Sequence, residues 1–236
     1  MIAVFVNMAT VMAGSLIGIF FRSRLKESLQ HSLLIALGLC TAVIGISSAI
    51  ATEDILCVIL CMALGTAMGE GLRIDDSIEN AGEFFRKRFV KKEGASSRFT
   101  EGFVSACILF CIGSMTIVGS LEAGIHHDYS IIFAKSTLDF VSSMALGAAM
   151  GFGVTCSILF ILVMQGGLTL LAGLVGPALS GTVVNEMSAI GGTILIGMAC
   201  NLLELGKERI RVANMLPAIF LPIAYIPISQ WIGSIL

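Results

Sequence analysis

Apolar runs of about twenty residues recur along this chain, and they limit its fold more than any other feature. They cover residues 3–21, 30–51, 54–72, 103–121, 137–157, 160–182, 185–204 and 216–236. An α-helix needs ~20 apolar residues to cross the ~30 Å hydrocarbon core of a bilayer. An outer-membrane barrel would instead alternate apolar and polar residues. The sequence therefore predicts an all-α, polytopic transmembrane helix bundle of about eight spans.

Composition agrees with a surface that faces lipid. Only 13% of the residues are charged and the mean hydropathy is +0.97, whereas a soluble domain carries roughly 25% charged residues. The first run has no basic residues before it, and Arg22 and Arg24 follow it. This pattern is typical of a retained span with its N-terminus outside rather than a cleaved signal peptide.

The basic residues indicate the orientation. With eight spans, 13 of the 14 lysines and arginines fall on one side, and only Lys135 does not. The positive-inside rule assigns that side to the cytoplasm. We therefore expect a multi-pass protein of the bacterial inner membrane, with the lipid bilayer as its main partner.

Two stretches are expected to depart from straight, uninterrupted spans. Residues 140–185 carry no charge and fit two spans joined by a tight turn, although a broken or re-entrant arrangement would fit as well. Three prolines, Pro217, Pro222 and Pro227, predict a kink in the last span.

Residues 73–101 form the only sizeable polar segment. Ile74, Ile78, Ala81, Phe85 and Phe89 recur at helical spacing, and basic residues gather at 86–92. We expect an amphipathic helix on the cytoplasmic interface. It would serve as a membrane-surface strut, or as a docking surface for partner proteins.

A weak internal repeat divides the chain into residues 1–121 and 122–236. Gly18 matches Gly153 at an offset of 135 residues, and Glu70 matches Glu204 at an offset of 134. Each half would then hold four spans, and the halves would be parallel, as in one symmetry type of transporter folds. The many small-residue faces also predict a homodimer.

The motifs that carry a family resemblance lie across the whole chain. They are the opening segment 7–18, Gln165-Gly166-Gly167, the segment 185–203 beginning Asn185-Glu186-Met187-Ser188, and the segment 210–218. Together they resemble the bacterial membrane-protein family labelled domain of unknown function 554. The resemblance implies a small multi-pass inner-membrane protein, for which a transport label is sometimes used, and it implies no settled activity.

Polar residues inside spans are costly and usually face a bundle interior or a wet path. The strongest group is Asn185, Glu186 and Ser188, which follows Pro177 and Gly181. Glu186 could bind a cation or proton at a broken helix while Asn185 orients a solute. Alternatively, Glu186 is a solvated residue of a short outer loop.

A second group is Asp139, Ser142 and Ser143. Asp139 could face a cavity, but Lys135 four residues earlier favours a helical ion pair. The two serines precede a run of small residues, and close helix packing explains them better than a pore lining.

Further candidates are single polar points on other spans. Gln165 and Gly166 could mark a helix interruption or a cross-helix hydrogen bond, and Asn7 and Asn201 could be interhelical bonds. A possible gate at equivalent cytoplasmic span ends is formed by Glu70 and Glu204, although nearby Arg73 and Lys207 offer them interfacial partners.

Other chemistry finds little support. All seven cysteines lie in apolar segments, so we interpret them as small packing residues, although the pairs Cys57/Cys61 and Cys107/Cys111 would also suit a soft-metal path. No phosphate-binding loop, zinc motif or nucleophile elbow occurs. We expect no enzyme, no cofactor, no resident metal and no nucleic-acid partner.

These observations predict a transporter of a small solute or ion, coupled to Na⁺ or H⁺, with Asp139, Gln165, Asn185, Glu186 and Asn201 lining the path. A passive ion channel is the nearest alternative. A non-transporting membrane scaffold, docking partners through its basic loop, is the alternative from a different class.

Overall fold

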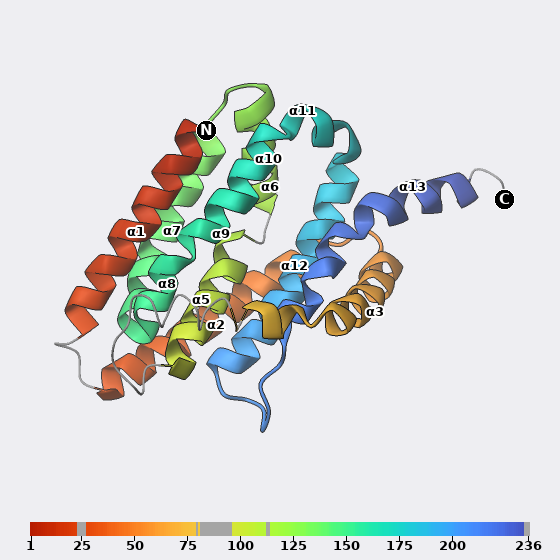
Figure 1. Ribbon diagram of the computed structural model, residues 1–236. Helices are drawn as coiled ribbons and strands as arrows, with labels where there is room; N and C mark the ends of the chain where they lie inside the picture. Colours follow the sequence, from red (N-terminus) through yellow and green to blue (C-terminus); the bar gives the residue numbers. More distant parts are fainter. Residues whose placement is uncertain (23–26, 79, 81–95, 112–113, 234–236) are drawn as a thin grey trace.

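A computed structural model describes residues 1–22, 27–78, 80, 96–111 and 114–233 (Figure 1). Within these ranges all regular secondary structure is helical. Six helices are long and apolar enough to cross a membrane, and two bent helix pairs bring the number to eight if each pair is one span. The predicted polytopic helix bundle is therefore confirmed.

The first three spans are α1 (Ile2–Arg22), α2 (Glu27–Ala49) and α3 (Ile55–Leu72). The fourth is the bent pair α5 (Ser96–Cys111) and α6 (Ser114–Ile125), followed by α7 (Ser130–Met150). The sixth joins α8 (Phe152–Cys156), α9 (Ile158–Ile161), a π-helical turn η1 (Leu162–Gly166) and α10 (Gly167–Leu170). After α11 (Ala172–Val175) and η2 (Gly176–Ala178) come α12 (Gly181–Leu202), η3 (Val212–Phe220) and α13 (Pro222–Gly233).

Arg211 and Arg22 lie at one end of the bundle, which we call the basic end. Arg211 forms an ion pair with Glu70 at the end of α3, with 3.4 Å between nitrogen and oxygen. Arg22 at the end of α1 lies against Gly151, which follows α7. In Figure 1 these helix ends and the loop after α12 lie on the lower side, opposite the N-terminus. This arrangement fits the orientation expected from the positive-inside rule.

Small residues hold the helices together, as membrane spans without a hydrophobic driving force require. α1 and α7 run parallel, and a Cβ added at Gly18 would lie 2.0 Å from the carbonyl oxygen of Met144. α3 and η3 run antiparallel, and a Cβ at Gly69 would lie 1.9 Å from the carbonyl oxygen of Asn214. These glycines therefore allow backbone-to-backbone approach that any larger residue would block.

The boundaries expected for the fifth and sixth spans, 137–157 and 160–182, were wrong. The turn between them lies at Gly151, whose φ of +86° suits only glycine, so the two spans are Ser130–Met150 and Phe152–Leu170. Lys135 lies before the apolar run 137–157, but its charge is neutralised inside the bundle, so the helix starts earlier than apolarity alone suggests.

Three of the spans are interrupted. The pair α5 and α6 is bent by 58°, and the pair η3 and α13 is bent by 42°. The second bend lies beside Pro222 and confirms the kink expected from the prolines. The π-turn η1 interrupts the sixth span at Gln165. Interruptions free backbone groups, and such groups are tolerated at membrane depth only inside protein or beside a wet cavity.

The amphipathic helix expected over 73–101 lies mostly outside the described residues. Residues 74–78 and 80 are helical, and α5 already begins at Ser96. The basic stretch 86–92 is not among the residues described. The internal repeat stays a prediction, although the bent pairs occupy the fourth and the last place in the order of spans.

Candidate functional site: a buried polar cluster

Lys135 and Asp139 form an ion pair inside the membrane-spanning part of the bundle. They are four residues apart on α7, and their side chains are only 7% and 9% exposed. The i, i+4 spacing puts both on one helix face, so the expected helical ion pair is confirmed. A buried charge is tolerated only when it is paired and hydrogen-bonded, so neither residue can stand alone here.

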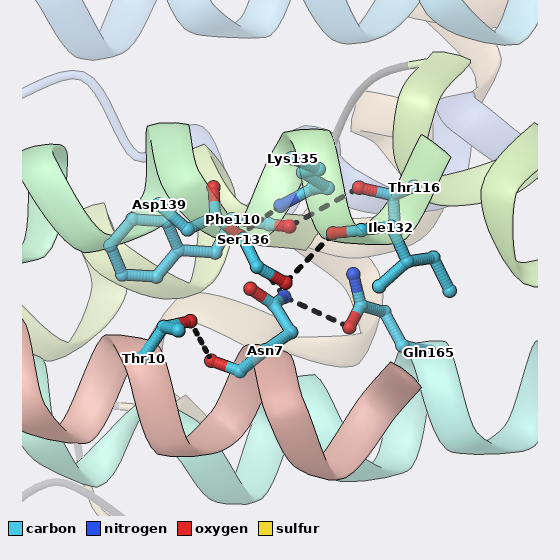
Figure 2. Close-up of polar contacts among 9 residues, drawn as sticks. All are labelled: Asn7, Thr10, Phe110, Thr116, Ile132, Lys135, Ser136, Asp139 and Gln165. Atoms are coloured by element: carbon cyan, nitrogen blue, oxygen red, sulfur yellow. Dashed lines mark hydrogen bonds and ion pairs between the residues drawn. The ribbon is translucent and has the colours of Figure 1, made fainter. Parts of the chain in front are cut away.

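Asn7 connects this ion pair to the sixth span (Figure 2). Its side-chain amide donates to a carboxylate oxygen of Asp139 at 3.1 Å and to the Gln165 side-chain oxygen at 3.0 Å. Asn7 and Gln165 are both fully buried. The three helices α1, α7 and η1 are therefore joined by one hydrogen-bonded group of polar side chains.

Several buried polar atoms in this group and on the neighbouring helices α6 and α10 have no hydrogen-bond partner. They are Asn7 Oδ1, Gln165 Nε2, Thr169 Oγ1 and Ser120 Oγ, all buried. Gly124 on α6 faces the carbonyl oxygen of Thr169, and both helices run toward the same end of the bundle. One turn earlier on each helix, Ser120 and Gln165 therefore lie at the same level. We call Asn7, Ser120, Lys135, Asp139, Gln165 and Thr169 the polar cluster.

A layer of apolar residues covers Asn7 on the side that faces away from the basic end, and Thr169 lies at the level of this layer because its carbonyl oxygen faces Gly124, next to Ala123. Ala3, Ala123 and Ile132 pack together from α1, α6 and α7, and each is at most 2% exposed. Asn7 follows Ala3 by one helical turn, so it lies directly beneath this layer. Toward the basic end, Ser143 of α7 packs tightly against Gly14 of α1. Asn7 is thus covered on both sides in this conformation.

The local backbone explains the position of Gln165. The residue lies in the π-turn η1, whose wider turn re-aims the side chains around it, and such turns are frequent at functional sites. Gly166 beside it is buried, with Leu162 and Met1 as neighbours. The interruption and the cross-helix hydrogen bond expected as alternatives at Gln165 are both present.

Glu186 lies in a separate place and has a different environment. It is 0% exposed, and it accepts hydrogen bonds from the Thr52 hydroxyl at 2.6 Å and the Glu53 amide at 2.8 Å. A longer bond of 3.3 Å comes from the Asp54 amide. The interpretation of Glu186 as a solvated loop residue is therefore wrong. The carboxylate instead holds the connection between α2 and α3.

Asn185 supports the same connection by donating to the Ala51 carbonyl oxygen at 2.8 Å. We call residues 51–54 with Asn185 and Glu186 the Glu186 anchor. Ser188 bonds only within α12, to the Val184 carbonyl oxygen at 2.8 Å. The Glu186 anchor and the polar cluster have no residue in common. The structure therefore does not bring the predicted path residues into one group.

The remaining candidates lie on α7 or at the basic end. Ser143 is buried and bonds to the Phe140 carbonyl oxygen at 2.9 Å, while Ser142 is half-buried. Asn201 exchanges two hydrogen bonds of 2.8 Å with the main chain of Ile210 and so closes the loop after α12. The possible gate residues differ: Glu70 binds Asn214 and Arg211, whereas Glu204 is exposed with a φ of +53°.

Sequence reasoning missed Ser120 and Thr169 as members of the polar cluster, Thr52 as a partner of the buried Glu186 carboxylate, and Asn214 as a partner of the exposed Glu70 carboxylate. A lone hydroxyl in an apolar run gives no signal in one sequence, because its importance depends on which helix faces it. Among the described residues, no group of three His, Cys, Asp or Glu side chains is placed to hold a metal ion.

Comparisons with known proteins agree with the membrane architecture. The family described as "Protein of unknown function (DUF554)" matches residues 2–226. The chain is 28% identical over 222 residues to the "Uncharacterized membrane protein YdfK" of Bacillus subtilis (strain 168), covering 92% of this chain and 91% of the relative. It is 29% identical over 219 residues to the "Uncharacterized protein YqgA" of Escherichia coli (strain K12), covering 92% of each. No solved structure matches.

Proposed function

Since the chain belongs to the DUF554 family of unknown function and is a membrane protein, we propose from its own geometry that it transports a small polar solute across the bacterial inner membrane. The polar cluster is the solute-binding site. The observation that carries this proposal is the pair of unpartnered atoms on Asn7 and Gln165, two residues that bond to each other beside a buried ion pair, together with two unpartnered buried hydroxyls on α6 and α10.

An unsatisfied buried donor or acceptor costs about 1–3 kcal/mol. A cluster that leaves four such atoms without a protein partner is therefore expensive unless something else completes them. The free groups include an acceptor (Asn7 Oδ1), a donor (Gln165 Nε2) and two hydroxyls that can do either. A small solute with both donors and acceptors, arriving with or instead of water, would complete the set.

The charges favour H⁺ over Na⁺ as the coupling ion at this place. Lys135 and Asp139 together are neutral, and the ammonium group of Lys135 already pairs with the carboxylate. A Na⁺ ion would have to approach next to that fixed positive charge in a low-dielectric environment. A proton can instead be exchanged through the pair itself, as in the carboxylate relays of other membrane pumps.

Transport requires that the polar cluster open to water. The outer cover is made partly of two alanines, Ala3 and Ala123, on separate helices, so a small displacement of α6 against α1 would expose Asn7. We therefore describe the structure as the occluded conformation of an alternating-access cycle.

Cysteine accessibility tests the proposal without knowledge of the substrate. Single cysteines replace Asn7, Ser120, Gln165 or Thr169 in a cysteine-free background, and a membrane-impermeant thiol reagent is added from each side. Ala189 and Ile194, fully buried on α12 among apolar neighbours, provide matched control positions. We expect the cluster positions to react faster than the controls, with a preferred side that changes with pH.

The other outcomes separate the alternatives. Simultaneous labelling from both sides, independent of pH, would indicate a passive channel. Labelling no faster than at the controls would indicate a dry core, and the transport proposal would be abandoned for a scaffold. The homodimer stays a prediction that crosslinking in membranes can check.

A further inference from the structure

A cavity lies between the bent span α5–α6, the sixth span, α12 and η3. Its volume is about 110 Å³, well above the ~10–15 Å³ that a water molecule needs. Four sulfur-containing side chains line it: Cys107 and Cys111 from α5, Met164 from η1 and Met187 from α12. The other lining residues are apolar, among them Phe160 and Leu216.

We propose that this cavity binds a soft monovalent cation, Cu⁺ or Ag⁺, through the two thiols and two thioethers that three separate elements bring to it. Cys107 and Cys111 are one helical turn apart, so both sulfurs lie on one face of α5. Met164 and Met187 approach from two other helices, which makes the donor set a property of the fold.

The donor chemistry selects the class of ion. Thiolate and thioether ligands suit Cu⁺, whereas Mg²⁺, Ca²⁺ and Mn²⁺ require oxygen ligands. The cavity lining offers no carboxylate or imidazole. Among the residues described, no three His, Cys, Asp or Glu side chains gather elsewhere as a zinc site would need. A sulfur-lined cavity with thioethers therefore fits a soft monovalent ion and excludes the hard divalent ones.

Binding balances in charge without any redox step. The cation forms a bond to one cysteine sulfur as the thiol releases its proton to bulk water, and the metal remains in the +1 state. The resulting metal–thiolate unit is neutral, which avoids the cost of an isolated charge in an apolar environment. The second cysteine and the two methionines act as neutral donors.

A neighbouring cavity provides a route to the site. This cavity, of about 210 Å³, shares Cys107, Phe160 and Leu216 with the sulfur-lined cavity and reaches Ser77 and Ile78 near the basic end. Because the two cavities share these lining residues, an ion could reach the sulfur atoms from the basic end.

The test is Cu⁺ transfer to the purified, reduced full-length protein from a coloured Cu⁺–bathocuproine disulfonate complex. We expect the wild-type protein to take up one Cu⁺. The double variants Cys107→Ala/Cys111→Ala and Met164→Leu/Met187→Leu should each weaken binding about tenfold or more. Leucine keeps the volume of methionine, so the second variant removes sulfur with little change in packing.

Cys57 and Cys61 provide the matched control. They form another buried i, i+4 pair, on α3, with their sulfur atoms 3.8 Å apart, and they do not line the cavity. Cys57→Ala/Cys61→Ala should leave Cu⁺ affinity unchanged. No uptake by the wild-type protein, uptake that survives both cavity variants, or loss confined to the α3 variant would overturn the proposal. The polar-cluster labelling experiment is independent of all these outcomes.

Discussion

The polar cluster and the Glu186 anchor are both buried groups that contain a carboxylate and amide side chains, and they differ in how many of their polar atoms have hydrogen-bond partners. The Glu186 carboxylate accepts from a hydroxyl and two main-chain amides. In the polar cluster, Asn7, Ser120, Gln165 and Thr169 each retain an atom without a partner. Membrane burial alone therefore does not identify a functional residue.

The comparison separates two uses of the same residue types. A carboxylate whose oxygens are filled by one short connection stabilises that connection, because removing it leaves several donors unpaired. Buried amides and hydroxyls without a hydrogen-bond partner lower the stability of the folded protein, and that stability is recovered when a ligand or water binds them. The following experiments test whether this distinction holds.

The largest effect should come from breaking the ion pair. Asp139→Leu leaves Lys135 as an uncompensated buried charge and should lower the unfolding free energy by about 3–5 kcal/mol. The double variant Lys135→Met/Asp139→Leu should recover most of that stability while pH-dependent labelling at Ser120→Cys is lost. Denaturant unfolding in detergent measures the first quantity. Equal stability of the single and double variants would show that the pair is not coupled.

The next largest effect should come from the Glu186 anchor. Glu186→Ala leaves the Thr52 hydroxyl and two amides without an acceptor and should destabilise the protein by about 3 kcal/mol. The folded fraction should still show normal labelling at Ser120→Cys, since the anchor does not include the polar cluster. If Glu186→Gln kept full stability but abolished the pH dependence of labelling, Glu186 would belong to the transport site after all.

A smaller effect on stability should distinguish a buried hydroxyl without a hydrogen-bond partner from one that has a partner. Ser120→Ala removes an unpartnered group and should change stability by less than about 1 kcal/mol, in the stabilising direction. Ser15→Ala is the control, because the Ser15 hydroxyl bonds to Thr155 across two helices at 2.8 Å. It should destabilise by about 1 kcal/mol. Thermal unfolding of both variants gives the comparison, and equal losses would mean that Ser120 has a protein partner.

The smallest effect lies outside the membrane. The Ser130 hydroxyl and amide hold the pKa of Asp128 below its ordinary value of 3.8. A lowered folded-state pKa contributes stability above the unfolded-state value and loses it as the pH falls through the folded value. Asp128→Asn should therefore reduce the fall of the thermal-unfolding midpoint with decreasing pH below about pH 4, and it should change the midpoint little at neutral pH. An unaltered acid slope would contradict this role.

Much of the fold could be predicted, and the site only in part. Apolar run length identified the spans, and prolines located the last kink, because both act through the local chain. Asn7, Asp139 and Gln165 could be selected as polar groups in spans. Their meeting in one cluster could not be predicted, because it depends on α1 and α7 packing in parallel through Gly14 and Gly18. Glu186 was selected for polarity too, and its three donors come from residues more than a hundred positions earlier.

The sequence by itself determined that this chain is a multi-span membrane protein, because hydropathy acts residue by residue along the chain. Only the tertiary structure decided which buried polar groups have hydrogen-bond partners and which have none. That depends on the side chains that neighbouring helices present at the same depth. The same cysteines and methionines would be ordinary packing residues on separate faces, and helix packing alone brings four of them around one cavity.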